Sequence, residues 1–281
     1  MTILVTGASG HLGRLVVERL LARGAAASDI VAGARTPAKA ADLGVRVVEL
    51  DYTKPETVAA ALEGVDRVLL ISSSEVGQRA AQHQVVIDAA VAAGVELLAY
   101  TSIYRAGEST HILAPEHVET EAAIAASGVP AVLLRNNWYT ENQLADVQYA
   151  GTSGVLAAAA GDGRIASASR VDYADAAAAV LLADDQAGRV YELAGDVAWN
   201  YDDLAAAAAA IFDREVAYVR QTVAERAAAL EAAGLDAGTA GFVAAMDAST
   251  AEGQLDGGDG SLAALIGRPT TPLVEGLRAA L

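Results

Sequence analysis

Over the first 135 residues, short apolar runs rich in β-branched residues alternate with stretches whose apolar residues recur every three or four positions. The runs lack the polar and apolar alternation of a half-exposed strand, so both faces are expected to be buried, as in a parallel sheet covered by helices. The alternation therefore predicts an α/β fold with a doubly wound parallel sheet, the Rossmann architecture. The expected strands are Ile3–Val5, Ile30–Ala34, Val45–Leu50, Val68–Ile71, Leu97–Tyr100 and Ala131–Arg135, and the expected helices are His11–Arg23, Pro55–Leu62, Arg79–Ala93 and Ala114–Ala126.

The pattern changes after Arg135. A further helix is expected at Val171–Asp184 and a further strand at Val190–Leu193, and beyond Gly195 the chain is alanine-rich and helix-prone. We expect residues 1–136, completed by about 162–190, to form the Rossmann domain. Residues 137–161 and 191–281 would then form a smaller, mostly helical substrate region that caps the carboxyl edge of the sheet.

The chain is strongly acidic: 19 Lys and Arg against 36 Asp and Glu give its 281 residues a formal net charge of −17. Nucleic acids and anionic membranes bind cationic surfaces, so neither is expected as a partner. No basic segment precedes the first apolar run, and the longest apolar stretches, Ala176–Ala183 and Leu204–Phe212, are too short to cross a bilayer. We therefore expect a cytoplasmic protein that acts on a small molecule, with its oligomeric state open.

The absence of cysteine excludes disulfides, a thiolate nucleophile and a zinc–thiolate site. The four histidines show no metal-ligand grouping, so no metal is expected. They are His11, His83, His111 and His117.

A glycine-rich turn follows the first expected strand and opens the first expected helix. Gly7 permits a tight turn, Gly10 lets a pyrophosphate approach the backbone, and Gly13 lets the helix pack closely on the sheet. The helix N-terminus adds N–H donors and a partial positive charge. The turn therefore predicts a dinucleotide site, whose contacts would come from Gly7, Ala8, Ser9, Gly10, His11, Leu12 and Gly13.

The end of the second expected strand selects between NAD and NADP. An NAD-selective site needs a carboxylate there for the ribose hydroxyls, whereas this chain has Arg35 and, one helical turn on, Lys39. An arginine fork suits a 2′-phosphate, so we expect NADP, although both cations are also compatible with an ordinary helix start. Asp51 and Tyr52, after the third strand, either flank the adenine or cap that strand.

Three serines, Ser72, Ser73 and Ser74, end the fourth expected strand at the same sheet edge. Ligands of open α/β sheets bind outside this edge, and small hydroxyl residues leave room for ribose and nicotinamide. The alternative is a serine loop that caps the next helix.

With these motifs in place, the chain resembles the NmrA-like group of atypical short-chain dehydrogenases/reductases, and within it the type 2 NAD(P)H:quinone oxidoreductases. The resembling stretches span nearly the whole chain in order, and LISSSEVGQR (residues 70–79) and RNNWYTEN (135–142) are far more specific than a glycine turn. The stretches are Val5–Gly13, Arg35–Ala40, Leu69–Gln82, Ala99–Ser102, Leu133–Asn142, Ala160–Ala176, Val190–Trp199 and Leu265–Thr271.

The resemblance implies that NADPH lies across the sheet edge, that the C-terminal region closes over it, and that a quinone takes hydride directly, without flavin. It implies phosphate contacts from the glycine turn, 2′-phosphate contacts from Arg35, and ribose and nicotinamide contacts from Ser72–Ser74. The cleft wall would comprise Asn136, Asn137, Trp138, Tyr139, Thr140, Glu141 and Asn142.

Two positions depart from the family pattern. Relatives usually have glycine at Asn137, so the backbone angles or the cleft volume are expected to differ there. Tyr104-Arg105 replaces a common Leu-His, which bears on substrate preference.

A conventional catalytic acid is missing. Typical short-chain dehydrogenases use Tyr-x-x-x-Lys, and the corresponding place holds His117 and Glu121. A quinone needs less acid assistance than a ketone, because the hydride adduct is a delocalised phenolate that water can protonate. His117 is a candidate proton donor, with Glu121 raising its pKa; the alternative is an exposed i, i+4 pair. Tyr104 is a second candidate.

Aromatic residues beside the expected cleft suggest how an acceptor is held. Trp138 and Tyr139 would stack on a quinone ring, with Asn142 nearby, unless they are core residues. The leading hypothesis is an NADPH-dependent reductase of quinones or similar electron-poor planar acceptors. The rival is a non-catalytic redox sensor that acts through a protein partner, and reduction of cationic dyes is a third possibility because of the acidic charge.

Overall fold

The computed structural model describes residues 1–281, and its centre is a seven-stranded sheet in the order β3-β2-β1-β4-β5-β6-β8. Every pairing in this sheet is parallel, which confirms the predicted doubly wound α/β architecture. The strands are β1 (Ile3–Val5), β2 (Ile30–Ala34), β3 (Arg46–Glu49), β4 (Arg67–Leu70), β5 (Leu97–Ile103), β6 (Ala131–Asn136) and β8 (Val190–Leu193).

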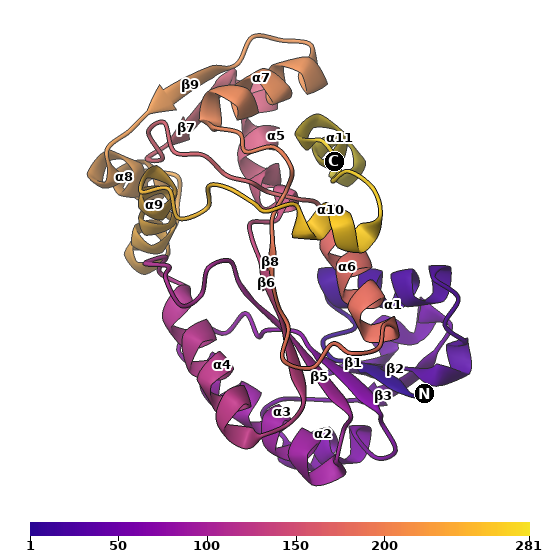
Figure 1. The fold of residues 1–281 in the computed structure, drawn as a ribbon. Helices are drawn as coiled ribbons and strands as arrows, with labels where there is room; N and C mark the ends of the chain where they lie inside the picture. Colours follow the sequence, from indigo (N-terminus) through magenta and orange to yellow (C-terminus); the bar gives the residue numbers. More distant parts are fainter.

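Both faces of the sheet are buried. In β1, Ile3 and Val5 belong to one hydrophobic core and Leu4 to the other, because successive side chains of a strand point to opposite faces. The first core lies under α1 (His11–Ala22) and α6 (Arg170–Leu182). The second lies under α2 (Pro55–Ala61), α3 (Arg79–Ala93) and α4 (Ala114–Ser127), and Figure 1 shows the two helical layers on either side of the strands. Short 3-10 turns η1 (Ala27–Asp29) and η2 (Pro37–Leu43) flank β2.

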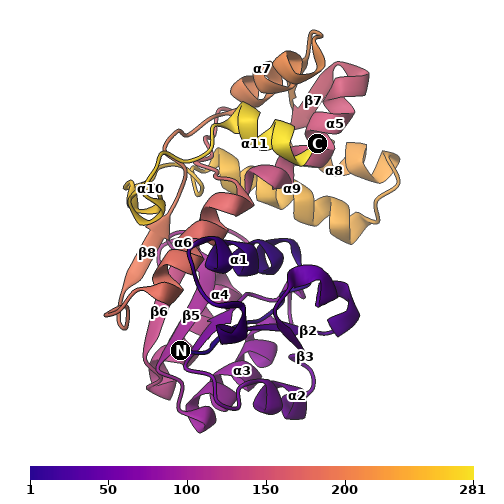
Figure 2. The ribbon, with the colours of Figure 1, turned by 90° about the vertical axis from the view of Figure 1, so that its right-hand side faces the viewer.

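A second group of elements lies beyond the carboxyl edge of the sheet, with its own core around Trp199, Tyr201 and Leu204 (Figure 2). It contains a two-stranded parallel sheet, β7 (Val155–Ala158) with β9 (Ala217–Arg220), which the sequence did not predict. The rest is helical: η3 (Thr140–Gln143), α5 (Leu144–Ser153), α7 (Tyr201–Phe212), α8 (Val223–Ala232), α9 (Ala237–Ala251) and α11 (Leu273–Ala280).

Two segments cross the expected boundary between the regions. Strand β8 continues to Leu193 within the main sheet, past the boundary expected near residue 190. Helix α10 (Ser261–Ile266) packs Leu262 and Ile266 into the first core, although the sequence placed residues 191–281 in the capping region. The remainder of the two-region division stays a prediction.

None of the helices combines the length and the apolar character that a bilayer crossing requires.

Candidate functional site

The glycine turn has the geometry that its sequence requires. Gly7 adopts a positive φ of 59°, and α1 begins at His11 with Gly10 at its N-cap and no side chain capping it. A Cβ at Gly13 would lie 2.4 Å from the Gly7 carbonyl oxygen, and one at Gly10 would lie 3.2 Å from it. Ala8, an expected cofactor contact, is fully buried and donates its N–H to the Gly33 carbonyl (2.9 Å), so it fixes the turn and its N–H is not free for a ligand. The Gly10 N–H donates to the Gly7 carbonyl (2.9 Å), whereas the N–H groups of Ser9 and of the first residues of α1 make no hydrogen bond within the chain. These unpaired donors at the start of a helix fit a pyrophosphate.

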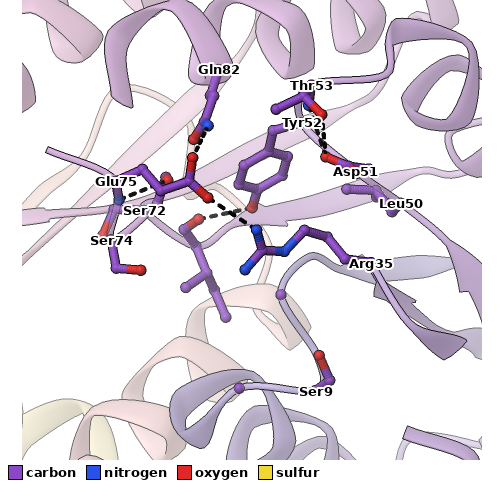
Figure 3. Close-up of a pocket in the computed structure, with 14 residues that line it drawn as sticks. Ser9, Arg35, Leu50, Asp51, Tyr52, Thr53, Ser72, Ser74, Glu75 and Gln82 are labelled. Carbon is purple, nitrogen blue, oxygen red and sulfur yellow. Dashed lines mark hydrogen bonds and ion pairs between the residues drawn. The ribbon is translucent and has the colours of Figure 1, made fainter. Parts of the chain in front are cut away.

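A cavity of about 220 Å³ lies beside this turn, at the carboxyl ends of β1, β2, β3 and β4 (Figure 3). This edge is where open parallel sheets bind ligands. The lining residues are Gly7, Ser9, Gly10, Arg35, Leu50, Asp51, Tyr52, Thr53, Ile71, Ser72, Ser73, Ser74, Glu75 and Gln82.

Arg35, the expected 2′-phosphate contact, follows β2 and points into this cavity. Its Nη1 lies 2.9 Å from Glu75 Oε1, and its side chain is 68% exposed, so the guanidinium is accessible to a ligand (Figure 3). Lys39 is different: it is exposed on η2 and lines neither this cavity nor its neighbour. The structure therefore brings Arg35, and not Lys39, to the expected site.

Asp51 and Tyr52 line the cavity and also hold its wall together. The Asp51 carboxylate accepts from the Thr53 N–H (3.0 Å) and hydroxyl (2.8 Å), and these bonds lower its pKa. The Tyr52 hydroxyl donates to the Ile71 carbonyl (2.8 Å) and lies 2.5 Å from Thr6 Oγ1, which ties the ends of β1, β3 and β4 together. Burial raises the pKa of Tyr52, so it stays a neutral phenol.

The three serines after β4 line this cavity and the next. The Ser72 N–H donates to Thr101 Oγ1 and the Ser73 N–H to His83 Nε2, both at 2.9 Å. The alternative of a serine cap for the next helix is wrong, because α3 begins after Gln78 and no side chain caps it.

A second cavity of about 410 Å³ shares Gly7, Gly10, Ile71 and Ser72–Ser74 with the first, so the two are continuous along the sheet edge. It runs from the glycine turn to the capping region. Its other lining residues are His11, Leu12, Gly13, Arg79, Ser102, Ile103, Leu113, His117, Asn136, Asn137, Trp138, Tyr139, Asn142, Arg170 and Leu255.

Asn136 and Asn137 join β6 to the capping region. Asn136 Nδ2 donates to the Tyr139 hydroxyl (3.3 Å), while its buried Oδ1 has no hydrogen-bond partner. Asn137 Nδ2 donates to the Leu255 carbonyl (3.0 Å), and its Oδ1 accepts the Trp138 N–H (2.7 Å). Asn137 has no positive φ, so the glycine of relatives is not needed here for its backbone angles. The asparagine side chain instead joins the cavity wall to the loop that carries Leu255, between α9 and α10.

The aromatic wall lies where the sequence predicted. Trp138 and Tyr139 line the second cavity, and the Arg170 guanidinium lies 5.1 Å from the Tyr139 ring centroid and donates to Asn142 Oδ1 (2.9 Å). Both aromatic side chains are partly buried, and each also packs against a hydrophobic core. The alternative that they are core residues is therefore met in part.

Two expected contact residues lie behind this wall instead of lining it. Thr140 Oγ1 lies 2.9 Å from Ser167 Oγ, and the Glu141 carboxylate accepts the Arg170 N–H (2.9 Å) at the start of α6. Neither residue lines either cavity, because each is engaged in holding the capping segment to α6 and its preceding loop.

The expected pairing of His117 with Glu121 is wrong. Glu121 is held by Arg135, whose Nη2 and Nε lie 2.6 and 2.9 Å from its oxygens, and it accepts the Ser102 hydroxyl (2.6 Å). His117 is buried at 5% exposure, so the alternative of an exposed helix pair is also wrong. Its Nδ1 lies 2.7 Å from the Tyr100 hydroxyl, and it lines the second cavity. Burial, reinforced by the positive charge of Arg79, lowers the pKa of His117 to about 3.

Tyr104, the other candidate donor, lies outside both cavities. It is buried against Ala166 and Ala194, and the Arg105 guanidinium lies 4.9 Å from its ring centroid. The chain turns after β5, with Arg105 at a positive φ of 51°, and the Tyr104 hydroxyl lies beside Gly257.

Arg79 is a cavity residue that was not predicted from the sequence. Its Nε donates to the Ser73 carbonyl (2.7 Å), its Nη1 lies 3.5 Å from Glu116 Oε2, and its side chain is 6% exposed. Helical spacing places Arg79 on the buried face of α3 with Gln82 and His83, so the signal was present in the sequence. Leu255 carried no such signal, because it comes from a loop 118 positions beyond Asn137.

No group of three or more histidine or acidic side chains is arranged to hold a metal ion.

Comparisons with known proteins agree with this geometry. Residues 7–184 match the NAD(P)H-binding family model. Quinone oxidoreductase 2 of Escherichia coli strain K12 is 49% identical over 97% of this chain and 96% of its own. The crystal structure of the E. coli NADPH-dependent quinone oxidoreductase QOR2 complexed with NADPH superposes with a TM-score of 0.95 at 48% identity, covering 99% of each chain. The NADP(H) complex of Citrobacter sp. triphenylmethane reductase gives 0.94 at 34% identity, covering 100% of each. The chain therefore belongs to the NAD(P)H-binding family, in which it groups with the NmrA-like type 2 NAD(P)H:quinone oxidoreductases.

Proposed function

We propose that this protein is an NADPH-dependent reductase that delivers hydride directly to a quinone or a similar electron-poor planar acceptor, without flavin. One observation carries the proposal: a continuous space runs from the glycine turn and Arg35 to an end walled by Trp138 and Tyr139. The first part fits a phosphorylated dinucleotide, and the second leaves room beside it for a flat ring. The relatives named above are reductases with NADPH or NADP(H) in their crystal structures.

Each part of the cavity has a distinct binding role. The N–H groups of the glycine turn hold the pyrophosphate, Arg35 binds the 2′-phosphate, and Asp51 and Tyr52 flank the adenosine. Ser72–Ser74, which line both cavities, contact the ribose and the nicotinamide, and the bound NADPH supplies the hydride. Holding donor and acceptor in contact provides most of the rate enhancement, since orientation alone removes several kcal/mol from a bimolecular barrier.

The absence of the Tyr-x-x-x-Lys dyad agrees with an acceptor that needs little acid assistance. Hydride addition to a quinone leaves an aromatic oxyanion, which is far less basic than an alkoxide. Trp138 and Tyr139 offer apolar ring faces for the acceptor, and His117 lines the same cavity.

The proposal is tested by following NADPH oxidation by the purified protein with 1,4-benzoquinone or menadione. We expect NADPH to be consumed and hydroquinone formed in equal amounts, above the rate without protein and without added flavin. A cationic triphenylmethane dye is a second acceptor to test, because a relative reduces this class and the chain carries a net charge of −17. NADPH binding without oxidation by any quinone or dye would contradict the proposal and favour the redox-sensor hypothesis.

The strong acidic charge also supports the expectation that neither nucleic acid nor an anionic membrane is a partner. Nucleic acid and anionic membrane surfaces repel such a chain, so we propose that the enzyme works in the cytoplasm on small molecules alone.

A further inference from the structure

Tyr100, on β5, lies directly beneath His117, on α4. Its side chain is fully buried in the core between the sheet and helices α2–α4. Its hydroxyl lies 2.7 Å from His117 Nδ1, and the Thr120 hydroxyl lies nearby. Burial raises the pKa of Tyr100, so the hydroxyl keeps its proton. The contact therefore joins a neutral phenol to one specific nitrogen of the imidazole.

The direction of this hydrogen bond follows from the burial of the phenol. If His117 Nδ1 carried the proton, the Tyr100 oxygen would accept it and the hydroxyl proton would need another acceptor in the core. The neighbouring Thr120 hydroxyl already pairs with His83 Nδ1 (3.0 Å) and donates to the Glu116 carbonyl (2.8 Å), so it is a poor substitute for the 2.7 Å contact with His117. An unsatisfied buried donor costs about 1–3 kcal/mol. Tyr100 therefore donates to Nδ1, and a neutral imidazole that accepts at Nδ1 carries its own proton on Nε2.

The Nε2 side of His117 belongs to the cavity. His117 lines the second cavity together with Ser102 and Arg79, and Nε2 has no hydrogen-bond partner within the chain. The imidazole also stays neutral, because burial and the nearby Arg79, His83 and His111 all disfavour a second proton. The result is a neutral N–H donor without a protein acceptor, facing the space beside the glycine turn.

We propose that His117 donates a hydrogen bond from Nε2 to the carbonyl oxygen of the acceptor, and that Tyr100 is the positioning residue that fixes this tautomer. The inference deepens the proposed function and rests on it. When the acceptor gains a hydride, the oxygen becomes an oxyanion, the N–H bond to it strengthens, and water supplies the neutralising proton. His117 keeps its own proton throughout, as neutral imidazoles do where they polarise a carbonyl.

The tautomer can be measured in the protein without cofactor or substrate, by nitrogen-15 NMR of the histidine rings. The protein contains an internal reference of the opposite kind: His83 Nε2 accepts the Ser73 N–H, so the neutral His83 carries its proton on Nδ1. We expect the Nε2–H pattern for His117 and the Nδ1–H pattern for His83, with assignments made from single histidine variants. The Nδ1–H pattern at His117 would overturn the inference.

Tyr100→Phe tests the positioning role. It removes the Nδ1 partner, so we expect His117 to lose its single tautomer and kcat for the quinone to fall about tenfold, with KM for NADPH unchanged. Tyr191→Phe is the matched control, since it also deletes one tyrosine hydroxyl bond, to Gln186 Oε1 (2.8 Å), away from both cavities. An unchanged His117 spectrum in Tyr100→Phe would contradict the role of Tyr100.

Two amide substitutions separate the donor role of Nε2 from simple packing. The amide nitrogen of glutamine reaches the place of Nε2, whereas that of asparagine reaches only the place of Nδ1. We expect His117→Gln to stay within a few-fold of wild-type kcat and His117→Asn to lose about 100-fold, as when one donor to an oxyanion is removed. Equal kcat values in the two variants would overturn the inference. Failure of the wild-type protein to reduce any acceptor, with the Nε2–H tautomer present, would overturn the proposed function instead.

Discussion

Arg35 Nη1 lies 2.9 Å from Glu75 Oε1, so the guanidinium at the dinucleotide end of the cavity already faces a carboxylate. Both side chains are substantially exposed, at 68% and 41%, and an exposed ion pair contributes little to stability. Glu75 therefore orients Arg35 into the cavity without holding it strongly. We propose that a 2′-phosphate, with more charge and more acceptor oxygens, displaces the carboxylate.

Replacing Arg35 by alanine is expected to weaken NADPH binding by about 1.5–3 kcal/mol, the range for a hydrogen bond to a charged group, and to leave NADH binding nearly unchanged. Calorimetric titration with both cofactors measures the difference. Equal losses for NADPH and NADH would remove the 2′-phosphate role. Lys39→Ala is the matched control: the side chain is a nearby cation outside both cavities, so the preference for NADPH should persist.

Much of the fold could be predicted because its signals are local. A strand buried on both faces must be apolar throughout, so the strands of the main sheet are visible in the sequence. Three of them have the expected bounds, and the ends of the others are displaced by at most three residues. The β7–β9 sheet was missed because Val155–Ala158 and Ala217–Arg220 pair across some 60 residues, and neither has a strong strand pattern of its own. Helix α10 was assigned to the wrong region because six residues carry no signal of which core they join.

In the site, too, features with a local sequence signal could be predicted and features that depend on distant contacts could not. The place of the glycine turn and of Arg35 at the cavity was predictable, because residues that follow neighbouring parallel strands meet at the same sheet edge, whereas their binding roles stay predictions. Glu121 was misread because the i, i+4 rule on a helix does not include a neighbouring strand, and here Arg135 on β6 takes the carboxylate. The Tyr100–His117 bond joins a strand to a helix, so only the folded chain reveals it.

Helix α1 approaches the glycine turn closely at Gly13, so Gly13→Ala tests whether this turn binds the phosphates of NADPH. The added Cβ would lie 2.4 Å from the Gly7 carbonyl oxygen, so the turn must open and its N–H groups must move. We expect a lower free energy of unfolding and at least tenfold weaker NADPH binding, measured by urea denaturation and calorimetry. Gly241→Ala, in α9, is the control: nothing lies within 4 Å of its Cβ, and alanine should stabilise the helix by about 0.5–1 kcal/mol. Unchanged NADPH binding in Gly13→Ala would show that the turn is not the phosphate site.

Glu121→Gln is expected to destabilise the protein without altering the protonation of His117. The variant leaves Arg135 with a neutral partner in place of a bidentate carboxylate, which costs about 2–3 kcal/mol in the free energy of unfolding. Glu119→Gln, exposed on the same helix, should stay within about 0.5 kcal/mol of wild type. Urea denaturation gives the stabilities, and ring nitrogen NMR gives the state of His117. A shifted His117 tautomer in Glu121→Gln would restore the pairing that the structure excludes.

Buried neutral histidines predict a loss of stability in mild acid. Burial lowers the pKa of His83 and His117 from 6.5 to about 3, and that of His111 to about 4. The unfolded chain therefore binds protons below pH 6.5 that the folded chain refuses, so the free energy of unfolding falls as the pH decreases. Between pH 7 and pH 5, each histidine that stays neutral in the folded chain lowers the free energy of unfolding by about 2 kcal/mol.

Asp146 and Asp247, whose pKa values burial raises, oppose this trend, so the test compares variants within one pH series. His83→Gln should reduce the stability difference between pH 7 and pH 5 by about 2 kcal/mol, measured by urea denaturation, because glutamine does not titrate. The same difference in His83→Gln and wild type would mean that folded His83 takes up its proton as readily as the unfolded chain does.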